Sequence, residues 1–199
     1  MCQSCLGSSS TPFMRFTLIT ALLLTAIFHH QIAAQELPDG IQGEIAPQLG
    51  VTHWIQLPEG KEELELSDFR GKTVVMLFFQ HTCPACHKRA FPTFRKLLKK
   101  FGDSDGVAFL AIQTPFEDFT DNTEAKLEIT AEKFDLDIPI GHLTKTPGFH
   151  SLNTAYKTGG TPWWVIVNPL GVVEYNGFYL NPEVAAENIE NMIAGKPVD

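Results

Sequence analysis

Two cysteines separated by two residues, Cys83 and Cys86, carry the clearest chemistry in this sequence. They follow the apolar run 73–79, which predicts a buried strand, and they stand at the start of a helical pattern. At a helix N-terminus the first sulfur is partly exposed, and the free N–H groups and the positive end of the helix dipole stabilise its thiolate. The spacing therefore predicts thiol–disulfide exchange, a chemistry that needs no cofactor.

The residue after this pair leaves a second interpretation open. His87 completes Cys-x-x-Cys-His, which is also the attachment motif of c-type haem. The motif follows a buried-strand pattern instead of lying in an all-helical chain. Beyond residue 34, only Met76 and Met192 could serve as methionine ligands, although another histidine could replace them. A c-type haem protein is the least favoured alternative.

The N-terminal 34 residues contain no acidic residue and one basic residue, Arg15, which the uncharged run 16–28 follows. This order, with small residues up to Ala34, predicts a signal peptide over residues 1–34. Met14 is an alternative translation start. The apolar run is shorter than the ~20 residues that span a bilayer, so retention as an N-terminal membrane tether is the alternative to cleavage.

The cysteine count agrees with export. Removal of the signal peptide, or a start at Met14, eliminates Cys2 and Cys5 and leaves only the pair at 83 and 86. A structural disulfide usually joins distant segments, whereas this pair would close a very small loop. We therefore expect a redox-active pair in an exported protein, periplasmic or otherwise extracytoplasmic. The formal net charge of −8 argues against nucleic acid as a partner.

The rest of the sequence predicts one α/β domain with a mixed sheet and helices on both faces. Residues 35–50 form an extended lead-in, and 51–57 with 64–66 predict a short strand pair. Strand, helix and strand in succession from residue 73 to 113 predict a right-handed parallel crossover, with a kink at Pro92. Further predicted elements are helices at 124–134 and 182–194, a short strand within 136–143, and an antiparallel hairpin at 163–167 and 172–175.

Basic residues dominate the surface of the helix that follows the cysteines. The six are Lys88, Arg89, Arg95, Lys96, Lys99 and Lys100. The simplest interpretation is a solvated helix face. Cations near the pair, together with the helix N-terminus, should also favour a thiolate, and we expect a Cys83 pKa below the free value of ~8.5.

Several motifs in order resemble the thioredoxin-like superfamily, specifically its exported TlpA/ResA-like branch of thiol–disulfide oxidoreductases, which is related to the AhpC/TSA redoxins. The resemblance covers residues 45–193 and implies a thioredoxin fold with an N-terminal β extension, as a domain at residues 45–195. The motifs are Leu66-Ser67-Asp68-Phe69-Arg70-Gly71-Lys72, Cys83-Pro84-Ala85-Cys86, Tyr156 with Gly160-Thr161-Pro162, and Asn168-Pro169-Leu170-Gly171.

The resemblance also implies roles for matching residues. Cys83 would be the attacking thiolate and Cys86 the resolving thiol. Pro162 would be a cis-proline facing the pair, and Thr161 would offer backbone contacts to an extended substrate. The implied partners are protein thiols and disulfides, with a membrane or periplasmic redox protein as the electron partner.

This chain departs from the family pattern around the cysteines. Thr82 occupies the position of a familiar tryptophan, and Leu77 replaces a buried acid on the preceding strand. Proton transfer from Cys86 is therefore expected to use His81, His87 or water.

Two further functions stay open. A peroxiredoxin-like peroxidase usually carries Thr or Ser three positions before its cysteine, where this chain has Gln80. Leu77 replaces one acid of the family pattern, and the acid that some relatives carry just after the second cysteine is also missing, which leaves a thioredoxin-like binding module with little catalysis as an alternative.

Residues elsewhere carry less signal. His53, His142 and His150 show no metal-site spacing and are expected to be surface or hydrogen-bonded residues. Of Trp163 and Trp164, one should belong to the core and the other should line a groove beside the cysteines. The connection 114–123 is expected to be a plain surface loop.

Overall fold

A computed structural model describes residues 40–51, 53–144 and 152–197. The expectations for residues 1–39, and for His150, lie outside the described residues. Within the part of the chain that the structure describes, no helix has both the length and the apolar character needed to cross a membrane.

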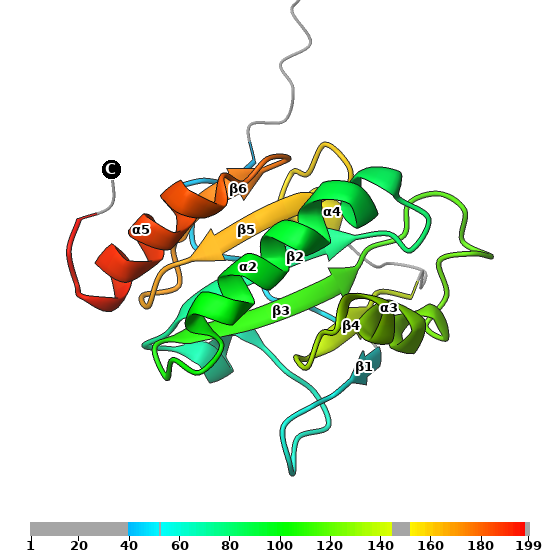
Figure 1. Cartoon of the computed structure of the whole chain (residues 1–199), viewed down its shortest axis with the longest axis horizontal. Coiled ribbons are helices and arrows are strands. Elements are labelled where there is room, and N and C mark those ends of the chain that lie inside the picture. The colour runs from blue at the N-terminus through cyan, green and yellow to red at the C-terminus, as the bar shows by residue number, and fades with distance from the viewer. Residues whose placement is uncertain (1–39, 52, 145–151, 198–199) are drawn as a thin grey trace, which may run out of the picture. The chain divides into compact units, whose positions relative to one another are not determined.

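Six strands form one mixed sheet in the order β1-β4-β3-β2-β5-β6 (Figure 1). The central pair is parallel, with Thr73 opposite Val107, and β5 runs antiparallel to β2 and to β6. The predicted α/β class and mixed sheet are confirmed. The strands are β1 (His53–Ile55), β2 (Thr73–Phe79), β3 (Val107–Gln113), β4 (Ile140–His142), β5 (Trp163–Val167) and β6 (Val173–Gly177).

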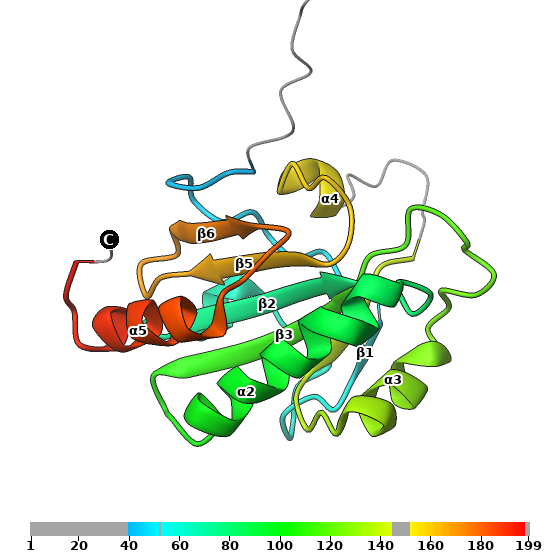
Figure 2. The same cartoon turned by 45° about the horizontal axis from the view of Figure 1, so that its top comes forward.

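Helices cover both faces of this sheet, as Figure 2 shows. Three of them, α2, α3 and α5, share one apolar layer, and α4 lies on the opposite face with apolar residues of the lead-in. The helical segments are η2 (Leu66–Phe69), η3 (Cys86–Ala90), α2 (Phe91–Phe101), α3 (Lys126–Phe134), α4 (Leu152–Ala155) and α5 (Pro182–Ile193).

The apolar run of β2 explains why the sheet is covered on both sides. Val75, Leu77 and Phe79 enter the layer beneath α2, and the alternate residues enter the layer beneath α4. All seven residues of the strand are buried. Close packing on both faces holds the strand in one position, so the segment that follows it is rigidly positioned at its start.

The predicted strand pair at 51–57 and 64–66 is wrong. The strand β1 pairs with β4, with His53 opposite His142, and η2 begins at Leu66. The N–H of Glu65 donates to the Asp68 carboxylate at 3.0 Å, and this local hydrogen bond favours a tight helical turn over an extended strand.

The helix after the cysteines also differs from the predicted one. It passes through the π-helical segment η3, in which the N–H of Phe91 bonds to the carbonyl of Cys86 five residues earlier. Pro92 therefore lies in the first turn of α2 and not inside a continuous α-helix. The missing N–H of a proline costs least at such a position.

Candidate active site

The two cysteines lie where β2 gives way to a helix. Strand β2 ends at Phe79, and four residues later the chain reaches Cys83, which is half-buried. Cys86 begins η3 and is completely buried. Both thiols are free, so the structure represents the reduced form of the pair.

Hydrogen bonds converge on the sulfur of Cys83. The N–H of Cys86 donates to this sulfur at 3.1 Å. The carbonyl oxygen of Thr161 lies 3.6 Å from it, and the bond between Thr161 and Pro162 is cis. The Thr161–Pro162 segment, far away in the sequence, therefore lies directly against the cysteine pair.

These contacts separate the acidities of the two thiols. The Cys86 thiol donates to the sulfur of Cys83, and this contact is the largest cause of a low Cys83 pKa. The N–H groups of Cys86 and Ala85 and the Thr161 side chain lower it further. Burial opposes these contacts, and the resulting pKa is about 6. The same contact and burial raise the pKa of Cys86 far above its usual value. The pair therefore holds one thiolate and one thiol near neutral pH.

The expected direction of the Cys83 pKa shift is confirmed, and so is one of its two expected causes, the N–H groups at the start of the helix; the other expected cause, nearby cations, does not contribute. Hydrogen bonds from Cys86, Thr161 and Ala85 produce the low pKa, and no lysine or arginine is among the causes. Among the nearby cations, Lys88 and Arg89 are exposed, where water screens their effect on the sulfur.

Gln80 joins the cysteine segment to two other segments. Its side-chain oxygen accepts a hydrogen bond from the Thr161 hydroxyl at 3.1 Å, and its side-chain nitrogen donates to the carbonyl of Glu117 at 3.3 Å. Only 2% of Gln80 is exposed. From the sequence, Gln80 argues only against a peroxidase, and its position between these segments was not predicted. The sequence feature that could have indicated its role is a polar residue directly after the apolar run of β2.

The connection 114–123 is not a plain surface loop. Its Asn122 is 1% exposed and exchanges two hydrogen bonds with Thr82, the residue before the first cysteine. The Asn122 oxygen accepts from the Thr82 N–H at 3.2 Å, and its nitrogen donates to the Thr82 hydroxyl at 3.0 Å. A buried amide satisfied in this way fixes the loop to the cysteine segment.

The two histidines proposed for proton transfer lie on the side of α3. The Thr130 hydroxyl donates to the carbonyl of Lys126, so it accepts from Nδ1–H of His81 at 3.0 Å and leaves Nε2 of His81 as the basic nitrogen. Nδ1 of His87 accepts from Nζ of Lys133 at 2.9 Å. Within the described residues, no hydrogen bond joins either imidazole to a cysteine sulfur.

Burial keeps both imidazoles neutral. It is the largest cause that lowers the pKa of His81 and of His87. The positive charge of Lys133 lowers both pKa values further, and the two rings lie with their centroids 5.9 Å apart. A neutral imidazole can accept a proton, so the structure is compatible with the predicted role and does not test it.

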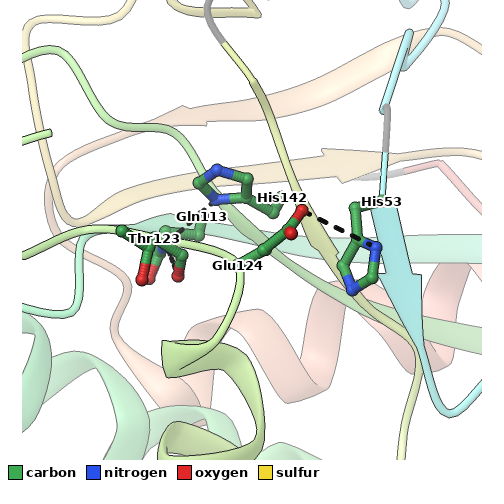
Figure 3. A network of polar contacts seen from close by, with 5 residues as sticks. All are labelled: His53, Gln113, Thr123, Glu124 and His142. Carbon is green, nitrogen blue, oxygen red and sulfur yellow. Dashed lines mark hydrogen bonds and ion pairs between the residues drawn. The ribbon is translucent and has the colours of Figure 1, made fainter. Parts of the chain in front are cut away.

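A second polar network lies at the ends of β3 and β4 (Figure 3). The side-chain nitrogen of Gln113 donates to Nδ1 of His142 at 3.0 Å and to the carbonyl of Thr123 at 3.0 Å. His53 lies opposite, with its Nδ1 3.9 Å from the Glu124 carboxylate. In the described part of the chain, no set of three or more His, Cys, Asp or Glu side chains could hold a metal ion.

The two tryptophans lie on opposite faces of β5, and both are buried. Trp163 belongs to the layer of α4 and Trp164 to the layer of α2. The expectation that one of them lines a groove holds for Trp164, which contributes to a cavity of about 440 Å³ beside Pro162.

Comparison with known proteins decides the family. The sequence model of the AhpC/TSA family matches residues 43–176, which include both cysteines and the cis-proline. The chain belongs to the AhpC/TSA family. Gln80, Asn122 and the groove beside Pro162 all fall within the matched or directly adjoining residues.

Individual relatives agree with this assignment. The thiol-disulfide oxidoreductase ResA of Bacillus thuringiensis subsp. konkukian is 30% identical over 119 residues, which cover 57% of this chain and 61% of the relative. The chain thus matches less than two thirds of the length of the curated relatives that it resembles. A crystal structure of a thioredoxin-like superfamily protein superimposes with a TM-score of 0.68 at 25% identity, covering 78% of this chain and 99% of the other.

A second solved structure supports the fold. The crystal structure of a thiol-disulfide isomerase from Corynebacterium glutamicum has a TM-score of 0.63 at 24% identity and covers 75% of this chain and 97% of its own. The structure of this chain is a thioredoxin-like fold, as the resemblance implied.

Proposed function

We propose that this protein is an exported thiol–disulfide oxidoreductase that exchanges a Cys83–Cys86 dithiol with protein partners. The observation that carries the proposal is the hydrogen bonding of Cys83, which combines a partly exposed sulfur with a pKa of about 6. At neutral pH such a cysteine is mostly thiolate, the form that attacks a disulfide. The family membership and the named relatives support the same activity.

The reaction follows from the two acidities. The Cys83 thiolate attacks one sulfur of a partner disulfide, and the partner's other sulfur leaves as a thiolate. Cys86 then loses its proton and attacks the sulfur of Cys83, which releases the second partner sulfur and leaves the protein oxidised. His81 or His87 would accept the proton of Cys86, and Thr161 would present its backbone to the bound partner. The reverse sequence oxidises a partner dithiol.

Export and domain limits belong to the same proposal. Residues 1–34 would direct export and either be removed or remain as a membrane tether, and residues 45–195 would form the catalytic domain. A periplasmic or membrane redox protein would return the pair to its working state. Expression in a bacterial host, followed by N-terminal sequencing of the protein from the periplasmic fraction, tests these points. A new N-terminus at Gln35 is expected.

Equilibration of the purified protein in glutathione and dithiothreitol buffers tests the activity. A reversible two-electron transition is expected in the wild type and should be absent from Cys83→Ser. The variant Cys86→Ser should accumulate a mixed disulfide with a partner protein. Failure of the wild-type pair to cycle, together with bound haem or rapid peroxide consumption, would instead support one of the alternative functions.

A further inference from the structure

A groove next to the cysteine pair has an apolar floor. It lies between the first turns of the helix after Cys83 and the segment 178–180 that follows β6, and its volume is about 440 Å³. Pro162, Trp164 and Leu180 are among the residues that line it. Cavities of this size accommodate ligands or side chains of a partner.

The rim of this groove is basic. Lys88, Arg89 and Lys96 line it, all three are exposed, and no Asp or Glu is among the lining residues. The guanidinium of Arg89 lies 5.3 Å from the centre of the Tyr179 ring, which is 70% exposed. The groove therefore presents concentrated positive charge on a chain whose formal net charge is −8.

The helix distributes its ion pairs unevenly. Arg95 pairs with Asp135 at 2.7 Å, and Lys100, about one turn beyond Lys96, pairs with Glu190 at 2.7 Å; neither of these two cations lines the groove. Within the described residues, none of the three cations at the groove has a carboxylate within ion-pair distance. All six cations are exposed, as the interpretation of a solvated helix face predicts, and the three at the groove are available to the carboxylates of a partner.

The groove reaches a residue that contacts the reacting sulfur. Thr161 lines it, and the carbonyl of Thr161 lies 3.6 Å from the sulfur of Cys83. A partner held at Cys83 by a mixed disulfide thus places residues close to its own cysteine over the groove. Charges on those residues would meet the basic rim.

We propose that this groove binds an acidic segment of the partner protein, in which Asp or Glu residues flank the reacting cysteine. The proposal rests on the proposed function and names its substrate class. The apolar floor receives a side chain of the segment, and Lys88, Arg89 and Lys96 attract its carboxylates. Such charge complementarity discriminates between partners and weakens as salt screens it.

Three matched peptides test the proposal. Each contains one cysteine bonded to 2-thiopyridine, flanked on both sides by Glu, by Gln or by Lys. Attack by Cys83 on the peptide sulfur releases neutral pyridine-2-thione, which is followed by its absorbance, and Cys86 then releases the peptide thiol as the protein becomes oxidised. Two electrons pass from the protein to the substrate disulfide, so no other reductant is needed.

The expected order of kcat/KM for the wild type is Glu, then Gln, then Lys, with about a tenfold difference between the extremes at low salt and a smaller one at high salt. In the triple variant K88Q/R89Q/K96Q the Glu-to-Lys ratio should fall to about one. The matched control R95Q/K99Q/K100Q removes the same charge from the same helix at positions that do not line the groove, and it should keep the ratio.

Two results would overturn the proposal. One is equal rates with the three peptides in the wild type, and the other is loss of the preference in the control variant, which would assign it to the overall field of the protein. If no peptide reacts, the proposed function fails, and fluorescence anisotropy of the same peptides with serine for cysteine still measures the charge preference.

Discussion

The side chain of Gln80 accepts a hydrogen bond from the Thr161 hydroxyl at 3.1 Å, and this bond joins the segment before the cysteines to the cis-proline. The backbone of Gln80 also accepts from the N–H of Cys83 at 3.1 Å. One buried residue therefore positions both the nucleophilic sulfur and the carbonyl that lies against it. We infer that Gln80 is a positioning residue for the exchange reaction.

Replacement of Gln80 by Met should test this role, because Met retains the size of the side chain and removes its hydrogen bonds. The partly buried Thr161 hydroxyl would lose its acceptor, whereas the Glu117 carbonyl would keep the Asn122 side chain as a donor, and the free energy of unfolding should fall by about 1 kcal/mol. Urea denaturation measures this free energy. In addition, kcat/KM for disulfide reduction should fall, and the pKa of Cys83, measured by alkylation, should shift. The exposed Gln42, changed to Met, is the matched control; equal behaviour of the two variants would refute the role.

The acidity of Cys83 provides a second prediction. The rate of its alkylation by iodoacetamide should rise with pH and follow an apparent pKa of about 6. Because the Cys86 thiol is the largest cause of this low value, Cys86→Ala should raise the pKa towards its ordinary value. Cys86→Ser keeps a donor at the same place and should raise it less. An unchanged pKa in Cys86→Ala would show that the backbone N–H groups alone stabilise the thiolate.

The pKa of Cys83 also indicates the range in which the reduction potential of the cysteine pair should lie. A stabilised thiolate stabilises the reduced form, so a lower pKa makes a pair more oxidising. A pKa of about 6 lies between those of thioredoxin, roughly 7, and of the oxidant DsbA, roughly 3.5. We therefore expect a potential between about −270 and −120 mV, nearer the thioredoxin value. Equilibration with glutathione measures it, and a value below that of thioredoxin would contradict this reasoning.

Local sequence patterns predicted the elements that form the core. The short apolar runs of β2 and β3 are typical of buried strands, and the spacing of Phe91, Phe94 and Phe101 is typical of one face of a helix. The cysteine pair was recognisable because its two residues are neighbours in the chain. In each case the information lies within a few residues.

Contacts between distant residues could not be predicted in this way. The bond between Gln80 and Thr161 joins residues 81 positions apart, and the bonds between Thr82 and Asn122 join residues 40 positions apart. Strand β1 has only three residues, too few for a hydrophobic pattern to select β4 as its partner. The cations of α2 look alike in sequence, and only the fold brings Asp135 to Arg95.

The network around His142 predicts how stability depends on pH. Burial is the largest cause of its lowered pKa, and it outweighs the opposing charge of Glu124; His53 adds to the lowering. His81 and His87 are lowered in the same direction. As the pH falls, these histidines bind protons in the unfolded chain before they do so in the folded protein. Protonation therefore stabilises the unfolded state relative to the folded state.

The thermal midpoint should therefore fall as the pH decreases below about 6.5, the ordinary histidine value, and the loss should continue down to the lowered pKa values of the folded protein. His142→Asn retains an acceptor for the side-chain nitrogen of Gln113 but does not titrate, so it should weaken the pH dependence relative to the wild type. Calorimetry between pH 8 and about pH 5 measures both. The same pH dependence in His142→Asn as in the wild type would contradict its assignment to the buried imidazole.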